Sequence, residues 1–222
     1  MHLMPTASSH AIEQTVAFVK GKLSGEGTGH DWFHTERVWK TAVHIAESEA
    51  ADVLVVELAA LLHDIADWKF AGGDESAGPH EARHWLEHIG VDGQTIAHVC
   101  DIIVHLSFKG AGVQSSMSTK EGMVVQDADR LDALGAIGIA RAFAYGGFRR
   151  REIHNPAVLP VYHATFEQYK NGSGTTINHF FEKLLLLKDT MNTATARAIA
   201  ERRHAFMEEF LREFYAEWDG TR

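Results

Sequence analysis

The chain has 222 residues, of which 45% are hydrophobic and 23% are charged, and its formal net charge is −9. These values are typical of a globular protein with one sizeable core, and the negative charge argues against duplex DNA or an acidic membrane surface as a partner, since both require clustered Lys and Arg. The single cysteine, Cys100, cannot form an internal disulfide, and the longest apolar stretch, residues 53–62, is too short to span a bilayer, so we expect a soluble cytoplasmic protein.

Helical periodicity runs through the first half of the sequence. Apolar residues at steps of three and four predict a first helix that includes Ile12 to Leu23 and a second that includes His34 to Ile45. Asp52 is a suitable N-cap for a third helix, which is apolar almost throughout. Two further helices are predicted at residues 78–89 and 95–106.

The second half is also predicted to be helical, with longer connections. Residues 107–118 are rich in Gly and Ser and predict a loop, after which Thr119 caps a helix that contains the apolar segment 124–134. Small residues in the run 133–144 favour close helix packing. A connection over residues 146–176, with one short helix near 164–169, leads to two final helices at 176–191 and 193–218. We therefore predict an all-α fold that forms a single domain over residues 1–222.

Four side chains from three of these predicted helices form a candidate metal site. His34 lies on the apolar stripe of the second helix, His63 and Asp64 follow the third helix directly, and Asp129 lies in the apolar segment 124–134. A carboxylate at a helix C-terminus is disfavoured by the helix dipole, and a buried carboxylate is costly unless it is paired, so both aspartates require a cation. Taken one at a time, His34 could be a core histidine bonded to a backbone carbonyl, and Asp129 could belong to a structural salt bridge.

The motifs around these residues resemble those of a known family. His34 in GHDWFHTERV, the pair in LLHDIAD and the aspartate in DADRLDALGAIGIAR are similar to the H…HD…D signature of the HD-domain metal-dependent phosphohydrolases. The serine-phenylalanine loop SFKG and the segment INHFFEKLLLLKDTMNT extend the resemblance to the bacterial subgroup of small stand-alone HD hydrolases, over nearly the whole chain.

This resemblance implies an HD-domain helical bundle, with a metal-binding core at about residues 25–145 and a C-terminal helical extension at about 176–218. It also implies one divalent metal held by His34, His63, Asp64 and Asp129. Ligands of this kind suit Mn²⁺, Fe²⁺, Co²⁺, Ni²⁺, Zn²⁺ or Mg²⁺. The implied activity is hydrolysis of a phosphorylated small molecule, in particular splitting of (deoxy)nucleoside triphosphates to monophosphate and pyrophosphate.

Further residues receive roles from their spacing relative to these ligands and from their charge. Asp67 resembles the acidic residue that follows the HD pair in related hydrolases and is a candidate catalytic group that orients or deprotonates the attacking water, together with Asp64; a plain surface carboxylate is the alternative. Asp132, one turn after Asp129, either contacts a ligand residue or is a solvated charge. The candidates for contacts to the substrate phosphates are Lys109, Arg141, His179 and Lys183, although Lys and Arg more often face solvent.

Several alternatives remain open from the sequence. His80 and His105 occupy positions at which binuclear relatives bind a second metal, which would favour phosphodiester cleavage or di-iron oxygenase chemistry. Trp68 replaces the second acid of alarmone hydrolases and argues against that substrate. His30 and Asp31 either shape the rim of the pocket or cap the second helix through Asp31. The arginines at 149–151 predict an exposed turn. A nucleotidase, a phosphodiesterase and a non-catalytic nucleotide sensor are the other candidate functions, and the chain is expected to be a monomer or a homodimer.

Overall fold

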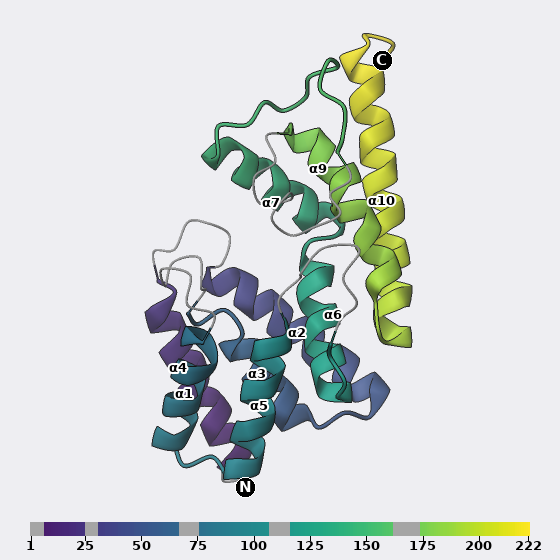
Figure 1. The fold of residues 1–222 in the computed structure, drawn as a ribbon. Coiled ribbons are helices and arrows are strands. Elements are labelled where there is room, and N and C mark those ends of the chain that lie inside the picture. Colours follow the sequence, from purple (N-terminus) through teal and green to yellow (C-terminus); the bar gives the residue numbers. More distant parts are fainter. Residues whose placement is uncertain (1–6, 25–30, 67–75, 107–115, 162–173) are drawn as a thin grey trace, which may run out of the picture. The chain divides into compact units, whose positions relative to one another are not determined.

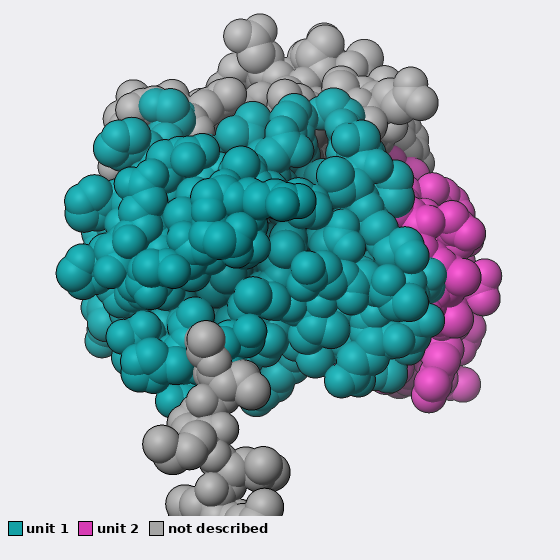
Figure 2. All heavy atoms as spheres, turned by 90° about the horizontal axis from the view of Figure 1, so that it is seen from below, with its two compact units in different colours: residues 1–108, 115–128 teal, residues 109–114, 129–222 magenta. Residues whose placement is uncertain are grey.

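The computed structural model describes residues 7–24, 31–66, 76–106, 116–161 and 174–222. These residues are divided between two compact units, the first from residues 1–108 and 115–128 and the second from residues 109–114 and 129–222 (Figure 2). The division falls inside one continuous helix, between Ala128 and Asp129. Within the described ranges both units consist of helices without any strand, which confirms the all-α prediction. The single-domain assignment stays a prediction.

In its described segments, the first unit is built from five helices and the first part of a sixth (Figure 1). They are α1 (Ala7–Lys22), α2 (Trp32–Glu49), α3 (Val53–Leu62), α4 (Ala77–His88), α5 (Gly93–Leu106) and α6 (Lys120–Asp132). Helix α3 lies among α1, α2 and α5, and α4 packs on α5.

The apolar character of α3 explains its central place. Every residue from Leu58 to Leu62 is completely buried, as expected for a helix whose only polar residue is Glu57. Asp52 caps its N-terminus, as predicted: the side chain accepts hydrogen bonds from the N–H groups of Leu54 (3.0 Å) and Val55 (3.3 Å). The helix thus ends inside the unit, and the residues that follow its last turn, His63 and Asp64, are held at the core.

The second unit contains α7 (Gly135–Phe148), α9 (Thr176–Glu182), the 3₁₀-helix η1 (Leu184–Thr190) and α10 (Ala194–Trp218). Helix α10 packs along α7 and η1, and α9 contacts α7 and η1. Buried apolar side chains from three of these elements, Ile177, Phe180, Leu187 and Met207, fill the space between them.

The predicted helix at 176–191 is wrong in one respect, because it breaks at Lys183 into α9 and η1. The backbone of Lys183 departs from helical geometry (φ −143°, ψ −58°). Leu184 and Leu187 are the buried residues of η1. Their spacing of three suits a 3₁₀-helix, in which residues i and i+3 are aligned. Helix α7 also continues beyond 144 to Phe148, whereas the predicted helix at 164–169 lies outside the described residues.

Among the described residues, no helix combines the length and the apolar character needed to cross a membrane. The cytoplasmic location stays a prediction.

Candidate metal centre

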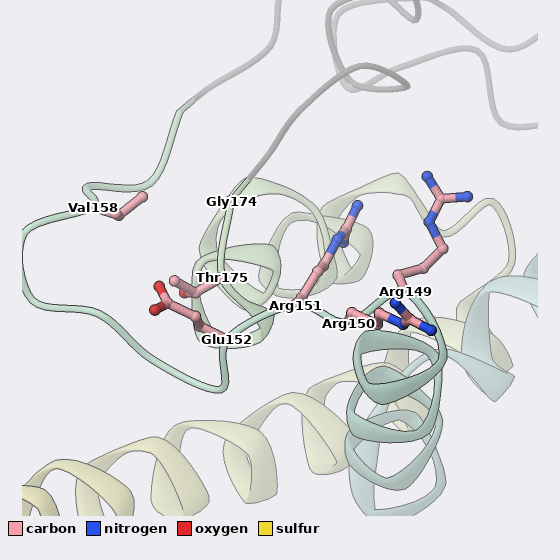
Figure 3. A pocket seen from close by; sticks show the side chains of 7 residues that line it. All are labelled: Arg149, Arg150, Arg151, Glu152, Val158, Gly174 and Thr175. Atoms are coloured by element: carbon pink, nitrogen blue, oxygen red, sulfur yellow. The ribbon is translucent and has the colours of Figure 1, made fainter.

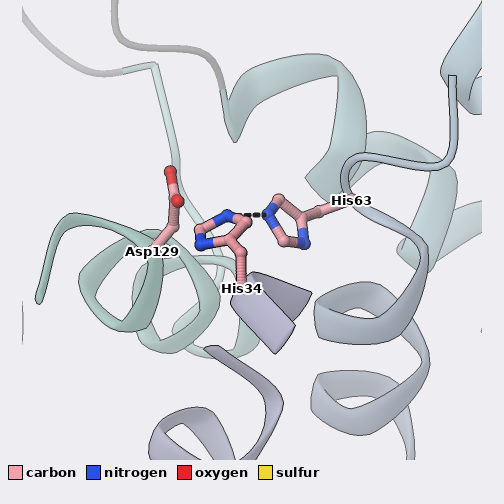
Figure 4. A group of neighbouring side chains, drawn as sticks. All are labelled: His34, His63 and Asp129. Carbon is pink, nitrogen blue, oxygen red and sulfur yellow. Dashed lines mark hydrogen bonds between the residues drawn. The ribbon is translucent and has the colours of Figure 1, made fainter. Parts of the chain in front are cut away.

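Three of the predicted ligands lie together in space. His34, His63 and Asp129 each offer one ligand atom, and these atoms all lie within 4.8 Å of one another (Figure 4). His34 comes from the first turn of α2, His63 from the end of α3 and Asp129 from the last part of α6. Both imidazoles are buried, and Asp129 is half-buried. This group could hold a metal ion.

The tautomer of His63 is fixed by a backbone carbonyl. Its Nδ1 lies 2.8 Å from the carbonyl oxygen of Ala60 in the last turn of α3. Because a carbonyl oxygen can only accept, Nδ1 carries the proton and donates it. In the neutral ring Nε2 is then left with a lone pair, which is the state that a metal ligand requires, and a second hydrogen bond of this kind is the usual way in which proteins orient a metal-binding histidine.

Asp64 is not one of that group, but its carboxylate forms a compact triangle of ligand atoms with the two histidines. Its Oδ2 lies 3.3 Å from Nε2 of His34 and 3.3 Å from Nε2 of His63, and the two Nε2 atoms are also 3.3 Å apart. The corners of such a triangle lie about 1.9 Å from its centre, which is close to the usual distance of about 2.0–2.2 Å between a divalent ion and its nitrogen or oxygen ligands. The arrangement therefore fits a divalent cation.

The position of His34 follows from the cap of its helix. Asp31 precedes α2 in extended conformation, and its carboxylate accepts a hydrogen bond of 2.8 Å from the backbone N–H of His34. The structure thus assigns Asp31 the cap role, one of the two roles that the sequence allowed. His34 itself is 1% exposed, and its ring meets that of His63 edge to face, with centroids 5.3 Å apart. His30 lies outside the described residues.

The N-terminus of α6, the helix that carries Asp129, is tied to the helices around it. Lys120 Nζ donates to the carbonyl oxygen of Glu49 at the end of α2 (3.0 Å), and Glu121 accepts the backbone N–H of Asp52 at the start of α3 (2.9 Å). Thr119 accepts the N–H of Gly122 (3.2 Å), as predicted for a cap. The beginnings of α3 and α6 and the end of α2 are thereby held together.

Asp132 and Arg141, which the sequence placed in different roles, form an ion pair. Arg141 Nη1 donates to Oδ2 of Asp132 at 2.7 Å, and the aspartate side chain is 5% exposed. Arg203 from α10 donates to the carbonyl oxygen of Leu131, and burial lowers the pKa of its guanidinium while Asp132 opposes that shift. Gly135, with φ of +72°, allows the chain to turn beside Arg203. At least one guanidinium nitrogen of Arg141 is therefore engaged with protein rather than free for a phosphate.

His179 and Lys183 lie one turn apart at the end of α9. Burial first, and then the charges of Lys183 and Arg151, lower the pKa of His179 to about 3. The ring is therefore neutral near pH 7, so His179 can serve as a hydrogen-bond donor but not as a cation, and Lys183 carries the charge of this pair. Lys109 and Asp67 lie outside the described residues.

The two histidines considered for a second metal lie in different environments. His105 Nδ1 is 2.9 Å from the carbonyl oxygen of Asp101 and 3.4 Å from its carboxylate. His80 is exposed and lines a cavity of about 530 Å³ with Ser76, Ala77, Glu81 and His84. Across the ranges that the structure describes, the ligand group contains neither of them, and the second metal stays a prediction.

Three features of this region are not indicated by the sequence. Asp127, two residues before Asp129, is completely buried. A helical pattern in the sequence alone does not reveal which of these two aspartates faces the core. Arg203 is remote in sequence from the carbonyl that it binds. Arg149 and Arg150 lie in an exposed turn, as predicted, but the sequence did not indicate that Arg149 to Arg151 also line a cavity.

Comparisons with known proteins agree with these observations. The sequence pattern of the HD domain family matches residues 32–134, from the start of α2 to just beyond α6. The protein YpgQ of Bacillus subtilis is 41% identical over 202 residues, which cover 90% of each chain. An HD-superfamily hydrolase of Bacillus thuringiensis has a similar crystal structure, with a TM-score of 0.76, 42% identity and coverage of 96% of this chain and 98% of that one. YpgQ in complex with ADP superposes with a TM-score of 0.76 at 36% identity, covering 96% and 97% of the two chains.

Proposed function

Because the chain belongs to the HD-domain family of metal-dependent phosphohydrolases, we propose that it hydrolyses nucleotides, and in particular that it splits (deoxy)nucleoside triphosphates to monophosphate and pyrophosphate. The observation that carries this proposal is the group formed by His34, His63 and Asp129, and the carboxylate of Asp64 lies beside both histidines. The ADP bound to YpgQ supports a nucleotide as the ligand.

We assign His34, His63, Asp64 and Asp129 as the ligands of one divalent cation. The set offers imidazole nitrogens and carboxylate oxygens without a thiolate, a combination that suits Mn²⁺, Mg²⁺ and the other borderline or hard ions named above. When bound, such an ion lowers the pKa of a water molecule and offsets the charge on phosphate oxygens. The protein contributes fixed ligand positions, through the Ala60 carbonyl at His63 and the Asp31 cap at His34.

The proposed reaction transfers the α-phosphorus of the nucleotide from the bridging oxygen to the oxygen of water, with pyrophosphate as the leaving group. Asp67, next to the metal ligands in sequence, is the proposed acceptor of the water proton. Lys183 and His179 are proposed to contact the phosphates, the first as a cation and the second as a neutral donor, which follows from the lowered pKa of His179. We also keep Lys109 and Arg141 as proposed phosphate contacts, with Arg141 limited by its bond to Asp132.

A screen of nucleotides with Mn²⁺, Mg²⁺, Co²⁺ and Ni²⁺ supplied in turn tests this proposal. Phosphorus NMR of the products distinguishes the candidate reactions, because pyrophosphate release indicates the proposed cleavage and release of inorganic phosphate indicates a nucleotidase. Asp64→Asn and Asp129→Asn should each lower turnover at least about a hundredfold while the helical circular dichroism stays near that of the wild type.

Asp189→Asn is the matched control, since it makes the same chemical change at a side chain that is 76% exposed. Full activity in Asp129→Asn, or activity that resists a chelator, would contradict the assignment. The identity of the product and the dependence on metal are measured separately. Activity on a different phosphorylated substrate would therefore change the proposed substrate class and leave the assignment of the metal ligands in place.

A further inference from the structure

The second unit contains a cavity whose wall is dominated by positive charge. It has a volume of about 390 Å³, within the range of small-molecule sites. Its lining residues are Arg149, Arg150, Arg151, Glu152, Val158, Gly174 and Thr175 (Figure 3). Three guanidinium groups against one carboxylate give the lining a formal charge of +2 (3 − 1), in a protein whose net charge is −9. None of these residues belongs to the candidate metal group.

The turn that carries the arginines has a defined backbone. At the end of α7 the N–H of Arg150 donates to the carbonyl of Gly147 (3.0 Å) and that of Arg151 to the carbonyl of Gly146 (2.8 Å), which is the double hydrogen bond that often ends a helix. Arg150 has φ of +55°, in the left-handed region where glycine is usual. An arginine therefore occupies a position that local geometry would assign to glycine.

The turn is also fixed against the opposite wall of the cavity. The N–H groups of Thr176 and Ile177 donate to the carbonyl oxygens of Glu152 (2.9 Å) and Ile153 (3.0 Å). Gly146 permits this approach, since a Cβ at this residue would lie 2.2 Å from the hydroxyl of Thr176. The arginines and Thr175 are thus held on two sides of one cavity by backbone contacts.

The side chains of the arginines and of Glu152 extend in different directions. Figure 3 shows Arg149 and Arg151 extending in the same direction from the turn, while Glu152 extends away from them. The carboxylate of Glu152 accepts a hydrogen bond from the Asn155 side chain (2.9 Å). The Arg151 guanidinium lies over the ring of Tyr145, 5.9 Å from its centroid, which restricts its motion. The carboxylate of Glu182 lies close to Gly174, since a Cβ built on that glycine would be 3.0 Å from it. This carboxylate accepts a hydrogen bond from the N–H of Val161 (3.0 Å).

We propose that this arginine pocket binds a small anion that carries two or more phosphate groups, such as inorganic pyrophosphate or the polyphosphate tail of a nucleotide. Guanidinium groups bind phosphate oxygens in pairs, with short charge-assisted hydrogen bonds, and several of them on one wall match a chain of phosphates better than a single charge. The charges of Lys183 and Arg151 both lower the pKa of His179, so Lys183 adds a further positive charge in the same unit. The proposal does not depend on which reaction the metal centre catalyses.

Protection of the arginines from chemical modification tests the proposal on the intact metal-loaded protein. Phenylglyoxal modifies guanidinium groups, and cleavage after Phe148 and Glu152 releases Arg149 to Arg151 in one short peptide for mass spectrometry. At a pyrophosphate concentration of about ten times its Kd, we expect these arginines to be modified roughly tenfold more slowly, as mass action requires. Arg212, with 73% of its side chain exposed on α10, is the internal control and should react at an unchanged rate.

Two further ligands, a nucleoside triphosphate and an unphosphorylated nucleoside, identify the source of the phosphates. Protection by a nucleoside triphosphate but not by pyrophosphate would support the pocket as a holder of a nucleotide tail, and protection by both would support a free diphosphate as well. If an unphosphorylated nucleoside protected the three arginines equally well, the proposal that the pocket recognises phosphate groups would be wrong. An unchanged rate at 149–151 with every phosphorylated ligand would overturn the proposal as a whole.

Calorimetric titration with pyrophosphate supplies an independent measurement. Arg149→Gln and Arg151→Gln should each weaken binding roughly tenfold or more, because each removes a charge-assisted contact, whereas Arg212→Gln should leave it unchanged. Identical affinities for pyrophosphate in the three folded and active variants would refute the proposed role of Arg149 and Arg151 in binding.

Discussion

The geometry of the candidate metal centre predicts a large thermal stabilisation by divalent ions. His34 and His63 are 29 residues apart in sequence, and Asp129 is a further 66 residues away (129 − 63). The unfolded chain therefore offers no preformed site, and an ion that binds the folded state alone stabilises it by about 2.7 kcal/mol at a concentration of 100 times its Kd. For a protein of this size, that free energy corresponds to a rise in Tm of roughly 5–10 °C.

Differential scanning fluorimetry after chelation, with Mn²⁺, Mg²⁺, Co²⁺ or Ni²⁺ added in turn, measures this shift. Asp129→Asn should lose most of it, because the neutral amide is a weaker ligand and the charge that balances the ion is gone. Asp189→Asn should retain it in full. If no ion raises the Tm of the wild type, or if Asp129→Asn responds as the wild type does, the reasoning from convergent ligand atoms to a cation site is refuted.

Three further predictions follow from the pairing, titration and capping of named residues. Asp132→Asn should lower the free energy of unfolding by about 2 kcal/mol, because it leaves the partly buried Arg141 without its carboxylate partner; urea denaturation measures the loss, and a double-mutant cycle with Arg141→Gln that shows simple additivity would contradict it. His179 has a folded pKa of about 3 against an unfolded value of about 6.5, so the unfolded chain binds a proton that the folded chain does not. Its contribution to the free energy of unfolding is complete above pH 6.5 and is lost toward pH 3, with about 2 kcal/mol lost at pH 5. His179→Asn should remove this part of the pH dependence. Identical profiles of unfolding free energy against pH in the variant and the wild type would exclude the lowered pKa of His179. Asp52→Ala should destabilise the fold by about 1 kcal/mol through loss of the α3 cap, and Asp52→Asn should restore most of it in the same denaturation assay.

The helices could be predicted from the sequence to the extent that their signals are local. Asp52 and Thr119 act as caps where the sequence places them, because a cap depends only on residues two or three positions away. The break at Lys183 could not be predicted in this way. An unbroken run of leucines is compatible with either helix type, and burial of Leu184 and Leu187 on the same side selects the 3₁₀-helix.

The candidate site shows the same contrast. His34, His63 and Asp129 were predicted from family motifs, and the side-chain atoms of these residues lie together. The bond of Arg141 to Asp132 joins two consecutive helices, and the approach of Arg203 to Leu131 spans 72 residues, so the periodicity of a single helix indicates neither. The arginines at 149–151 resemble any solvated charged turn in sequence. Their cavity depends on backbone bonds to residues 176 and 177, which only the fold supplies.

Protons alone are a poor explanation for the triangle formed by His34, His63 and Asp64. If both imidazoles were protonated, each could donate to the carboxylate of Asp64, but two positive charges would then lie 3.3 Å apart with a single negative charge in the triangle. If only one were protonated, its single Nε2 hydrogen could point to the carboxylate or to the other ring, and at least one of the three close contacts would remain between lone pairs. A divalent cation satisfies the three atoms at once, because it accepts all of their lone pairs. A single bound cation therefore accounts for all three close contacts at once.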